Sequence, residues 1–207
     1  MYIFITSIIG YLFGCIHGSQ LVGLYKKINI KNIGSKNAGA TNATLTLGWK
    51  YGFIVAFIDI FKAIVSISLI ILLLNKVEII NEAQTIYIYI NALFVILGHN
   101  YPLPMNFRGG KGTASFFGLL LVIDWKIAFM GVAIILIFAF VTDYLAIGVL
   151  FMYISFFAFS YYSFGTTVAM IGFGMLVVSI IKHIDNYKRI SKNEEIRFSS
   201  IHQKEVS

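Results

Sequence analysis

Charged residues, proline and cysteine are scarce in this chain, and each shortage excludes a class of structure. Lys, Arg, Asp and Glu make up 12% of the 207 residues, whereas soluble domains contain roughly 25%. With 58% hydrophobic residues and a mean hydropathy of +0.84, the chain has too much apolar surface for one water-soluble core. The single cysteine, Cys15, excludes an internal disulfide and a cysteine-cluster metal site. No His, Cys or Asp cluster has the spacing of metal ligands, so we expect no bound metal and no cofactor.

Long apolar runs indicate an all-α, polytopic integral membrane protein, because a membrane-spanning helix needs roughly 20 apolar residues. The first run has no basic segment before it and no small-residue cleavage site before Lys26, so we interpret it as a retained span. We expect about seven transmembrane helices, and five full spans with two partial ones are the alternative. The runs cover residues 2–25, 52–74, 86–97, 113–122, 127–141, 144–162 and 166–181.

Basic residues are distributed unequally between the segments that connect these runs. With seven alternating crossings, one face receives the Lys and Arg residues of segments 26–50 and 108–111 and of the polar tail. The other face receives only Lys76 and Lys126. By the positive-inside rule, this places the N-terminus outside and the C-terminus in the cytoplasm. The same rule explains the net charge of +7, so we expect no nucleic-acid partner.

The first segment on the basic face, residues 32–44, is rich in small polar residues. Its glycines and alanines let backbone N–H groups approach a ligand closely, and Ser35, Asn37 and Asn42 add short polar groups. Such a loop can form an anion-binding site where a helix begins. An ordinary polar turn between two spans is the alternative.

The second segment on this face, residues 98–113, contains both prolines of the chain and the sequence Gly109-Gly110-Lys111-Gly112. A lysine between glycines at the start of an apolar run suits a phosphate, which is attracted by free amides, an ammonium and the positive end of a helix. The spacing is not that of a Walker A loop. A turn near lipid headgroups is the alternative.

Ionisable residues also occur within or beside the apolar runs. Asp59 and Lys62 lie three residues apart in the second run, where they can face a polar cavity or form a structural ion pair. His99 can act as a catalyst or as a hydrogen-bonding residue at the end of a helix. His183 starts the polar tail, with Asn186 three residues later on the same helical face.

Taken together, these stretches closely resemble the motifs of the bacterial acyl-phosphate:glycerol-3-phosphate acyltransferase family (the PlsY family). Residues 34–42 are similar to its first motif and residues 98–112 to its second, and Asp59 and Lys62 match a polar pair in its second helix. The matches keep their order over nearly the whole chain. Residues of the same types as in the family's C-terminal segment recur here as His183, Asn186, Arg189 and Glu195.

The resemblance implies a membrane enzyme that moves a fatty acyl group from acyl phosphate to the 1-hydroxyl of sn-glycerol 3-phosphate, giving lysophosphatidic acid and phosphate. It implies a multi-pass protein of the bacterial plasma membrane with its active site facing the cytoplasm. The transmembrane acyltransferase domain would cover residues 1–182, and a polar cytoplasmic segment would cover residues 183–207. The partners would be the two substrates and the lipid bilayer, and the oligomeric state is left open.

The resemblance also implies roles for individual residues. Because acyl phosphate is already activated, the enzyme needs to align hydroxyl and carbonyl, hold both phosphates and stabilise the oxyanion. His183 or the substrate's own phosphate would be the general base, and an acyl-enzyme at Ser35 is disfavoured because no base is visibly paired with it. The implied catalytic residues are Ser35, Lys111, His183 and Asn186. The implied substrate- or phosphate-binding residues are Gly34, Asn37, Gly39, Thr41, Asn42, His99, Gly109, Gly110, Gly112, Arg189 and Glu195.

The chain departs from the family pattern at several functional positions. Leu45 stands where the first motif usually continues into an arginine, which removes a bidentate phosphate donor. Asp143 and Ala146 replace a basic residue and a serine of the third motif, so we expect Asp143 to weaken anion binding. His17 replaces the proline of an upstream turn. The open alternatives are a divergent paralogue with a different small hydroxylated acceptor and a catalytically inactive membrane binding protein.

Overall fold

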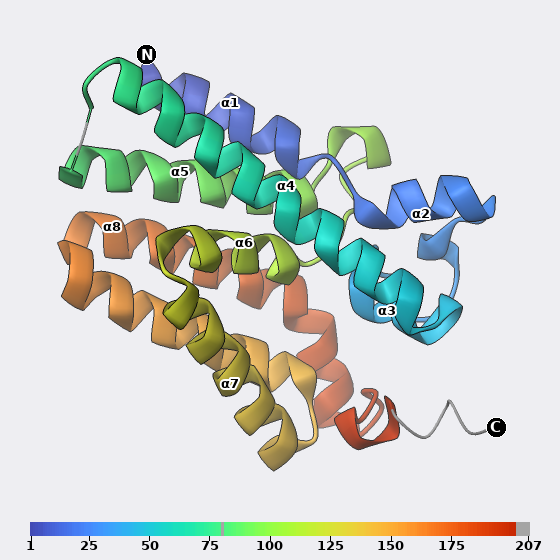
Figure 1. Cartoon of the computed structure of the whole chain (residues 1–207). Helices are drawn as coiled ribbons and strands as arrows, with labels where there is room; N and C mark the ends of the chain where they lie inside the picture. The colour runs from blue at the N-terminus through green and yellow to red at the C-terminus, as the bar shows by residue number, and fades with distance from the viewer. Residues whose placement is uncertain (80, 202–207) are drawn as a thin grey trace. The chain divides into compact units, whose positions relative to one another are not determined.

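The computed structural model describes residues 1–79 and 81–201, and within these ranges the chain forms helices and no strand, as Figure 1 shows. The chain divides into two compact units, Met1–Ile123 and Asp124–Ser207. The first unit contains α1 (Tyr2–Gly14), α2 (Gly18–Lys26), η1 (Ile30–Asn32), α3 (Ala40–Leu47), α4 (Trp49–Lys76), α5 (Asn81–Asn100), η2 (Leu103–Met105) and α6 (Thr113–Ile123). The second unit contains α7 (Trp125–Thr142), α8 (Leu145–Ser191) and η3 (Phe198–Ile201).

Each of the seven predicted apolar runs falls on helical structure, with two differences in detail. The run 2–25 is divided between α1 and α2 by a turn at residues 15–17. The helix α6, with 11 residues, is shorter than a full span. Among the described residues, five stretches are long and apolar enough to cross a membrane, so the number of seven crossings stays a prediction. These stretches are Tyr2–Lys26, Trp49–Lys76, Glu82–Met105, Trp125–Thr142 and Leu145–Ser191.

Close backbone approach joins α1 to α5 in the first unit. A Cβ added to Gly14 or to Gly98 would collide with the backbone of the facing helix, so glycine is required on both sides. Small residues permit this packing in apolar surroundings, where helices associate through van der Waals contact. The buried Asn91 of α5 adds polar links, because its Nδ2 donates to Thr6 O at 3.0 Å and its Oδ1 accepts from Ser66 Oγ at 2.9 Å. Asn91 thereby connects α5 to both α1 and α4.

The second unit is built around a hairpin within α8. Gly165 interrupts α8 with φ 78° and ψ −178°, a conformation that glycine adopts without steric strain, and the chain reverses there (Figure 1). The two arms correspond to the predicted runs 144–162 and 166–181. The two arms contact each other through the rings of Phe157 and Phe173, whose centroids lie 5.6 Å apart. The first arm packs on α7.

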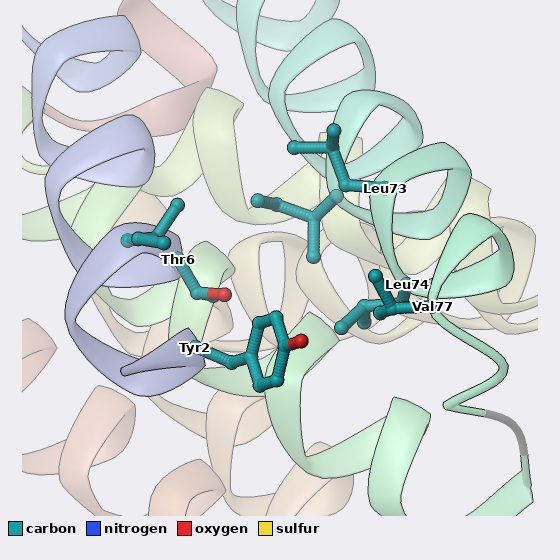
Figure 2. Close-up of a pocket in the computed structure, with 7 residues that line it drawn as sticks. Tyr2, Thr6, Leu73, Leu74 and Val77 are labelled. Atoms are coloured by element: carbon teal, nitrogen blue, oxygen red, sulfur yellow. The ribbon is translucent and has the colours of Figure 1, made fainter.

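An apolar pocket of about 160 Å³ lies between α1 and the end of α4 (Figure 2). Tyr2 and Thr6 approach it from α1, whereas Leu73 and Leu74 approach it from α4. The pocket lies at the end of α1 opposite Gly14, and none of the predicted site residues lines it. Its lining suits hydrocarbon and offers no group for phosphate chemistry.

Candidate active site

Asn42 organises the first polar loop, residues 33–39, from a buried position in the first turn of α3. Its Oδ1 accepts a hydrogen bond from the Ser35 amide at 2.9 Å. Its Nδ2 lies 2.9 to 3.0 Å from three carbonyl oxygens, those of Ile30, Ile33 and Asn37. The side chain thus ties the backbone of η1 and of the loop to the first turn of α3. We expected Asn42 to contact substrate, and the structure uses its amide to fold the loop.

Several polar groups around the hydrogen bonds of Asn42 are accessible to solvent. Ser35, Lys36 and Thr41 are exposed, and Gly39 precedes α3 without a side chain to cap it. The first N–H groups of a helix have no partner within the helix and attract anions. Gly34 has φ 62°, and a Cβ there would collide with the Asn42 side chain. The loop therefore presents two hydroxyls, an ammonium and a helix start.

The second polar loop, residues 101–112, folds back onto the end of α5. The amide of Gly109 donates to Asn100 O at 3.2 Å, and the amide of Gly110 donates to His99 O at 3.0 Å. A Cβ at Gly110 would collide with the imidazole of His99. These two amides are engaged with α5, so the expectation that they would be free for phosphate is wrong. The glycines instead allow the loop to pack against His99.

Lys111 and Gly112 lead directly into α6. Gly112 has φ 80°, and its carbonyl accepts the hydrogen bond from Phe116 N at 2.8 Å that opens the helix. Lys111 is half-buried beside this helix start. An ammonium next to a helix N-terminus is an arrangement that binds phosphate well.

Lys62 lies at the centre of a buried polar network in the first unit. Its Nζ is 3.1 Å from Asp59 Oδ1 and 2.8 Å from His99 Nδ1, and it donates to Gly14 O at 3.0 Å and to Ile16 O. Buried charges are costly unless they are paired and hydrogen-bonded, and here they are both. An ammonium can only donate, so His99 Nδ1 is the acceptor and its ring proton resides on Nε2. The network connects α4 to the turn after α1 and to the end of α5.

His17 packs a second imidazole against this network, and neither of its ring nitrogens has a hydrogen-bond partner among the described residues. Its ring lies 4.4 Å from that of His99, centroid to centroid, and potential ligand atoms of His17, Asp59 and His99 lie within 4.8 Å of one another. No sequence spacing reveals this group, because its members come from three segments. The ammonium of Lys62 already lies between Asp59 and His99, so the cluster contains its own cation, which would repel a metal ion. We therefore interpret it as a positioning network.

In the second unit, His183 and Asn186 are buried one turn apart on the second arm of α8. Nδ1 of His183 lies 2.8 Å from Ser179 O. A carbonyl oxygen only accepts, so the ring proton resides on Nδ1 and the lone pair on Nε2. A neutral histidine in this form can accept a hydrogen bond or a proton from a hydroxyl group at Nε2.

Glu195 returns to α8 after the helix has ended. Its Oε1 accepts from Asn186 Nδ2 and its Oε2 from Arg189 Nε, both at 2.6 Å. The carboxylate is 13% exposed and Arg189 is 40% exposed. A carboxylate repels phosphate, so this geometry favours a supporting role for Glu195, which orients Asn186 and Arg189.

The motifs recognised in the sequence and the membrane-spanning helices agree with comparisons to known proteins. A model of the family described as glycerol-3-phosphate acyltransferase matches residues 4–193. The chain belongs to this family. It is 56% identical over 207 residues to glycerol-3-phosphate acyltransferase 1 of Oceanobacillus iheyensis, with 100% of both chains covered. It is 33% identical over 205 residues to the glycerol-3-phosphate acyltransferase of a Hydrogenobaculum species, covering 94% of this chain and 96% of the relative.

Solved structures of PlsY, an integral membrane glycerol 3-phosphate acyltransferase, have the same fold. The glycerol 3-phosphate form superposes with a TM-score of 0.84 at 26% identity, and 98% of each chain is covered. The lysophosphatidic acid form gives a TM-score of 0.82 at 25% identity, with 97% of this chain and 98% of that chain covered. The prediction of an all-α membrane protein of this family is confirmed.

The positions at which this acyltransferase departs from its family pattern lie in different surroundings. Leu45 is partly exposed on α3, close in sequence to the exposed Thr41. Ala146 is buried in the first turn of the first arm of α8. His17 belongs to the Lys62 network. Sequence reasoning found Asp59, Lys62 and His99 one by one, but missed that His17 joins them, since only folding brings these segments together.

Proposed function

We propose that this acyltransferase transfers a fatty acyl group from acyl phosphate to the 1-hydroxyl of sn-glycerol 3-phosphate. The products are lysophosphatidic acid and inorganic phosphate. The observation that carries the proposal is the pair of polar loops in one unit, each of which contains a lysine and leads into the start of a helix. Both substrates carry phosphate, so two anion-binding loops on a membrane protein fit the pair of substrates better than they fit any neutral ligand.

The chemistry requires little covalent assistance, because the acyl phosphate is a mixed anhydride with phosphate as leaving group. The hydroxyl oxygen of glycerol 3-phosphate attacks the acyl carbonyl, an ester bond forms, and the bond from the carbonyl carbon to the phosphate oxygen breaks. The hydroxyl proton passes to a base, either His183 or phosphate. Rate enhancement then comes from alignment and from stabilising the charge on the carbonyl oxygen and the departing phosphate.

The described residues divide these tasks by their chemistry. Lys111 and the start of α6 bind the departing phosphate, and Ser35 and Thr41 donate to oxygens of a phosphorylated substrate. His183 accepts from the attacking hydroxyl at Nε2, the nitrogen that carries its lone pair. A nucleophilic role for Ser35 is disfavoured, because its hydrogen bond to Asn42 uses the backbone amide and no base among residues 1–79 and 81–201 is paired with its hydroxyl.

The proposal places the protein in the bacterial plasma membrane, with the polar loops and the C-terminus facing the cytoplasm. The basic residues of the two loops support this orientation by the positive-inside rule. It also treats residues 1–182 as the transmembrane acyltransferase domain and residues 183–207 as a polar cytoplasmic segment. A cytoplasmic site at the bilayer edge lets a soluble acceptor meet a donor with a lipid tail.

The test is turnover by the purified protein in lipid nanodiscs with palmitoyl phosphate and glycerol 3-phosphate. Phosphate release that depends on glycerol 3-phosphate supports the acceptor, and absence of turnover with palmitoyl-CoA supports the donor. Lys111→Ala should reduce kcat/KM by about a hundredfold, the scale for removing a charged phosphate contact. Lys76→Ala, on the end of α4, is the matched control and should behave as wild type. Turnover that is unchanged in Lys111→Ala would contradict the assigned role of that lysine.

A further inference from the structure

Asp143, which stands where the family pattern has a basic residue, holds the C-terminal helix η3. Its Oδ1 accepts from the Ser199 amide at 2.8 Å, and its Oδ2 accepts from Ser199 Oγ at 2.9 Å. Its carbonyl oxygen accepts from Phe198 N, also at 2.8 Å. Both carboxylate oxygens are therefore used by one residue that lies 56 positions later in the sequence.

An aromatic contact reinforces this polar one. The rings of Phe140, in the last turn of α7, and Phe198 meet edge to face with centroids 5.1 Å apart. Asp143 itself has φ 64°, in the left-handed region that Asp tolerates better than most residues, and it ends α7 in a C-cap position. The C-terminal end of α7 thus binds η3 through both an aromatic and a polar contact.

The segment between α8 and η3, residues 192–197, is fixed at both of its ends. At the α8 end the amide of Glu194 donates to Arg189 O at 2.8 Å, and the chain reverses through Asn193, whose φ is 57°. At the other end Asp143 holds Ser199. Glu195 lies in the middle, hydrogen-bonded to Asn186 and Arg189. A short segment with two fixed ends has few alternative conformations, so the position of Glu195 depends on both attachments.

We propose that Asp143 is a positioning residue for acyl transfer, which acts by fixing residues 192–197 so that Glu195 orients Asn186 on α8. This inference rests on the proposed function. Without the attachment, Glu195 would be held mainly through Arg189, and partly exposed ion pairs contribute little on their own. Asn186 would then lose the partner that fixes its amide. The carboxylate of Asp143 accepts both hydrogen bonds that Ser199 donates. The acidic residue at this position, where the family pattern has a basic one, therefore has a structural role.

A proteolysis experiment tests the attachment without substrate. Trypsin cuts after Lys192 and Arg197, so the rate of cleavage at these two sites, measured by mass spectrometry on the full chain in nanodiscs, reports release of the segment. Asp143→Ala and Ser199→Ala should each increase cleavage about tenfold, because cleavage follows the population of the open segment. Asp143→Asn, which keeps an acceptor for the amide and a donor for the hydroxyl but loses the charge, should increase cleavage less than Asp143→Ala does. Asp124→Ala removes another carboxylate that accepts from a backbone amide, at the opposite end of α7, and is the matched control.

A turnover experiment tests the positioning role. Asp143→Ala should lower kcat about tenfold, and Asp143→Asn should restore part of this loss. If Asp143 acts through Glu195, adding Asp143→Ala to a Glu195→Gln protein should cause no further loss in kcat. Both changes would then disrupt the same interaction, so their effects would not add. Glu195→Ala, which also removes the carboxylate, provides a second background if Glu195→Gln does not fold.

The outcomes separate the inference from the proposed function. Unchanged proteolysis in Asp143→Ala, or losses in kcat that multiply in the double variant, would overturn the positioning role. A wild-type protein that transfers no acyl group to glycerol 3-phosphate would overturn the proposed function, while the proteolysis result would still decide whether Asp143 holds the segment.

Discussion

Nζ of Lys62 lies 2.8 Å from Nδ1 of His99, and both side chains are buried. Lys62 comes from α4, and His99 comes from the end of α5. The second polar loop, residues 101–112, begins there and is called the glycine loop for its Gly109, Gly110 and Gly112. The backbone oxygen of His99 in turn accepts a hydrogen bond from the amide of Gly110. The position of the glycine loop therefore depends on an ammonium in another helix.

Removing this ammonium should destabilise the first unit. Lys62→Met leaves Asp59 buried without its cation, and breaking a buried ion pair from one side costs about 3–5 kcal/mol. Replacing both members, in Lys62→Met with Asp59→Leu, should recover part of this loss, because no unpaired charge remains. Thermal unfolding of the purified proteins in one detergent measures both effects. Lys76→Met is the exposed control, and a double variant less stable than Lys62→Met would contradict the assignment.

Gly110→Ala should reduce turnover more than it reduces stability. The added methyl group would meet the imidazole of His99 and push the glycine loop away from α5. A displacement of about 1 Å in a positioning loop can cost on the order of a hundredfold in rate. Gly172→Ala is the matched control, because its new methyl group would meet Ser160 Oγ at 3.4 Å, an ordinary contact between the two arms of α8. Equal turnover in the two variants would show that the loop does not need its contact with His99.

Leu45→Arg should improve the use of glycerol 3-phosphate. Leu45 is partly exposed on α3, so a guanidinium at this position can reach an anion at the loop surface. A charge-assisted bond of about 1.4 kcal/mol would lower KM about tenfold. Leu45→Gln, which has a polar head without charge, separates charge from shape. A KM for glycerol 3-phosphate that is unchanged or higher in Leu45→Arg would show that the first loop does not bind this substrate.

The attachment of η3 should weaken in acid, because protonation removes the charge that strengthens the two hydrogen bonds between Asp143 and Ser199. The amide of Ser199 above all, with help from its hydroxyl and from Arg197, lowers the pKa of Asp143 below its ordinary value. A carboxyl group with a depressed pKa in the folded state stabilises that state above its unfolded pKa, about 3.9, and loses this contribution as the pH falls through the folded value. Protection of residues 192–201 from hydrogen exchange should thus be constant from about pH 8 to 5 and fall below about pH 4. Asp143→Asn should show no such fall, and a fall near neutral pH in the wild type would point to a different group.

Local sequence patterns predicted the helices and the motif-bearing loops well. Hydropathy located the run 166–181 and its separation from the run 144–162. This separation could be predicted because Gly165 breaks the helix through its local backbone conformation, which depends on adjacent residues only. The family motifs were visible because Gly109, Gly110 and Lys111 are adjacent in the chain.

Contacts between distant segments were not predictable in this way. His17 and His99 are 82 positions apart, and Asp143 and Ser199 are 56 apart, so no spacing links either pair. The amides of Gly109 and Gly110 were expected to be free because glycines leave the backbone N–H groups open to a phosphate, whereas the fold gives them carbonyl partners on α5. Charge alone suggested that Asp143 opposes anion binding, and the structure shows its oxygens bound to Ser199.

The most direct test of the central claim is the stoichiometry of a reaction started with palmitoyl phosphate and glycerol 3-phosphate. We expect lysophosphatidate and inorganic phosphate to form in equal amounts, with both products absent when glycerol 3-phosphate is left out. Phosphate release at the same rate without glycerol 3-phosphate, or with no lysophosphatidate formed, would contradict acyl transfer to this acceptor.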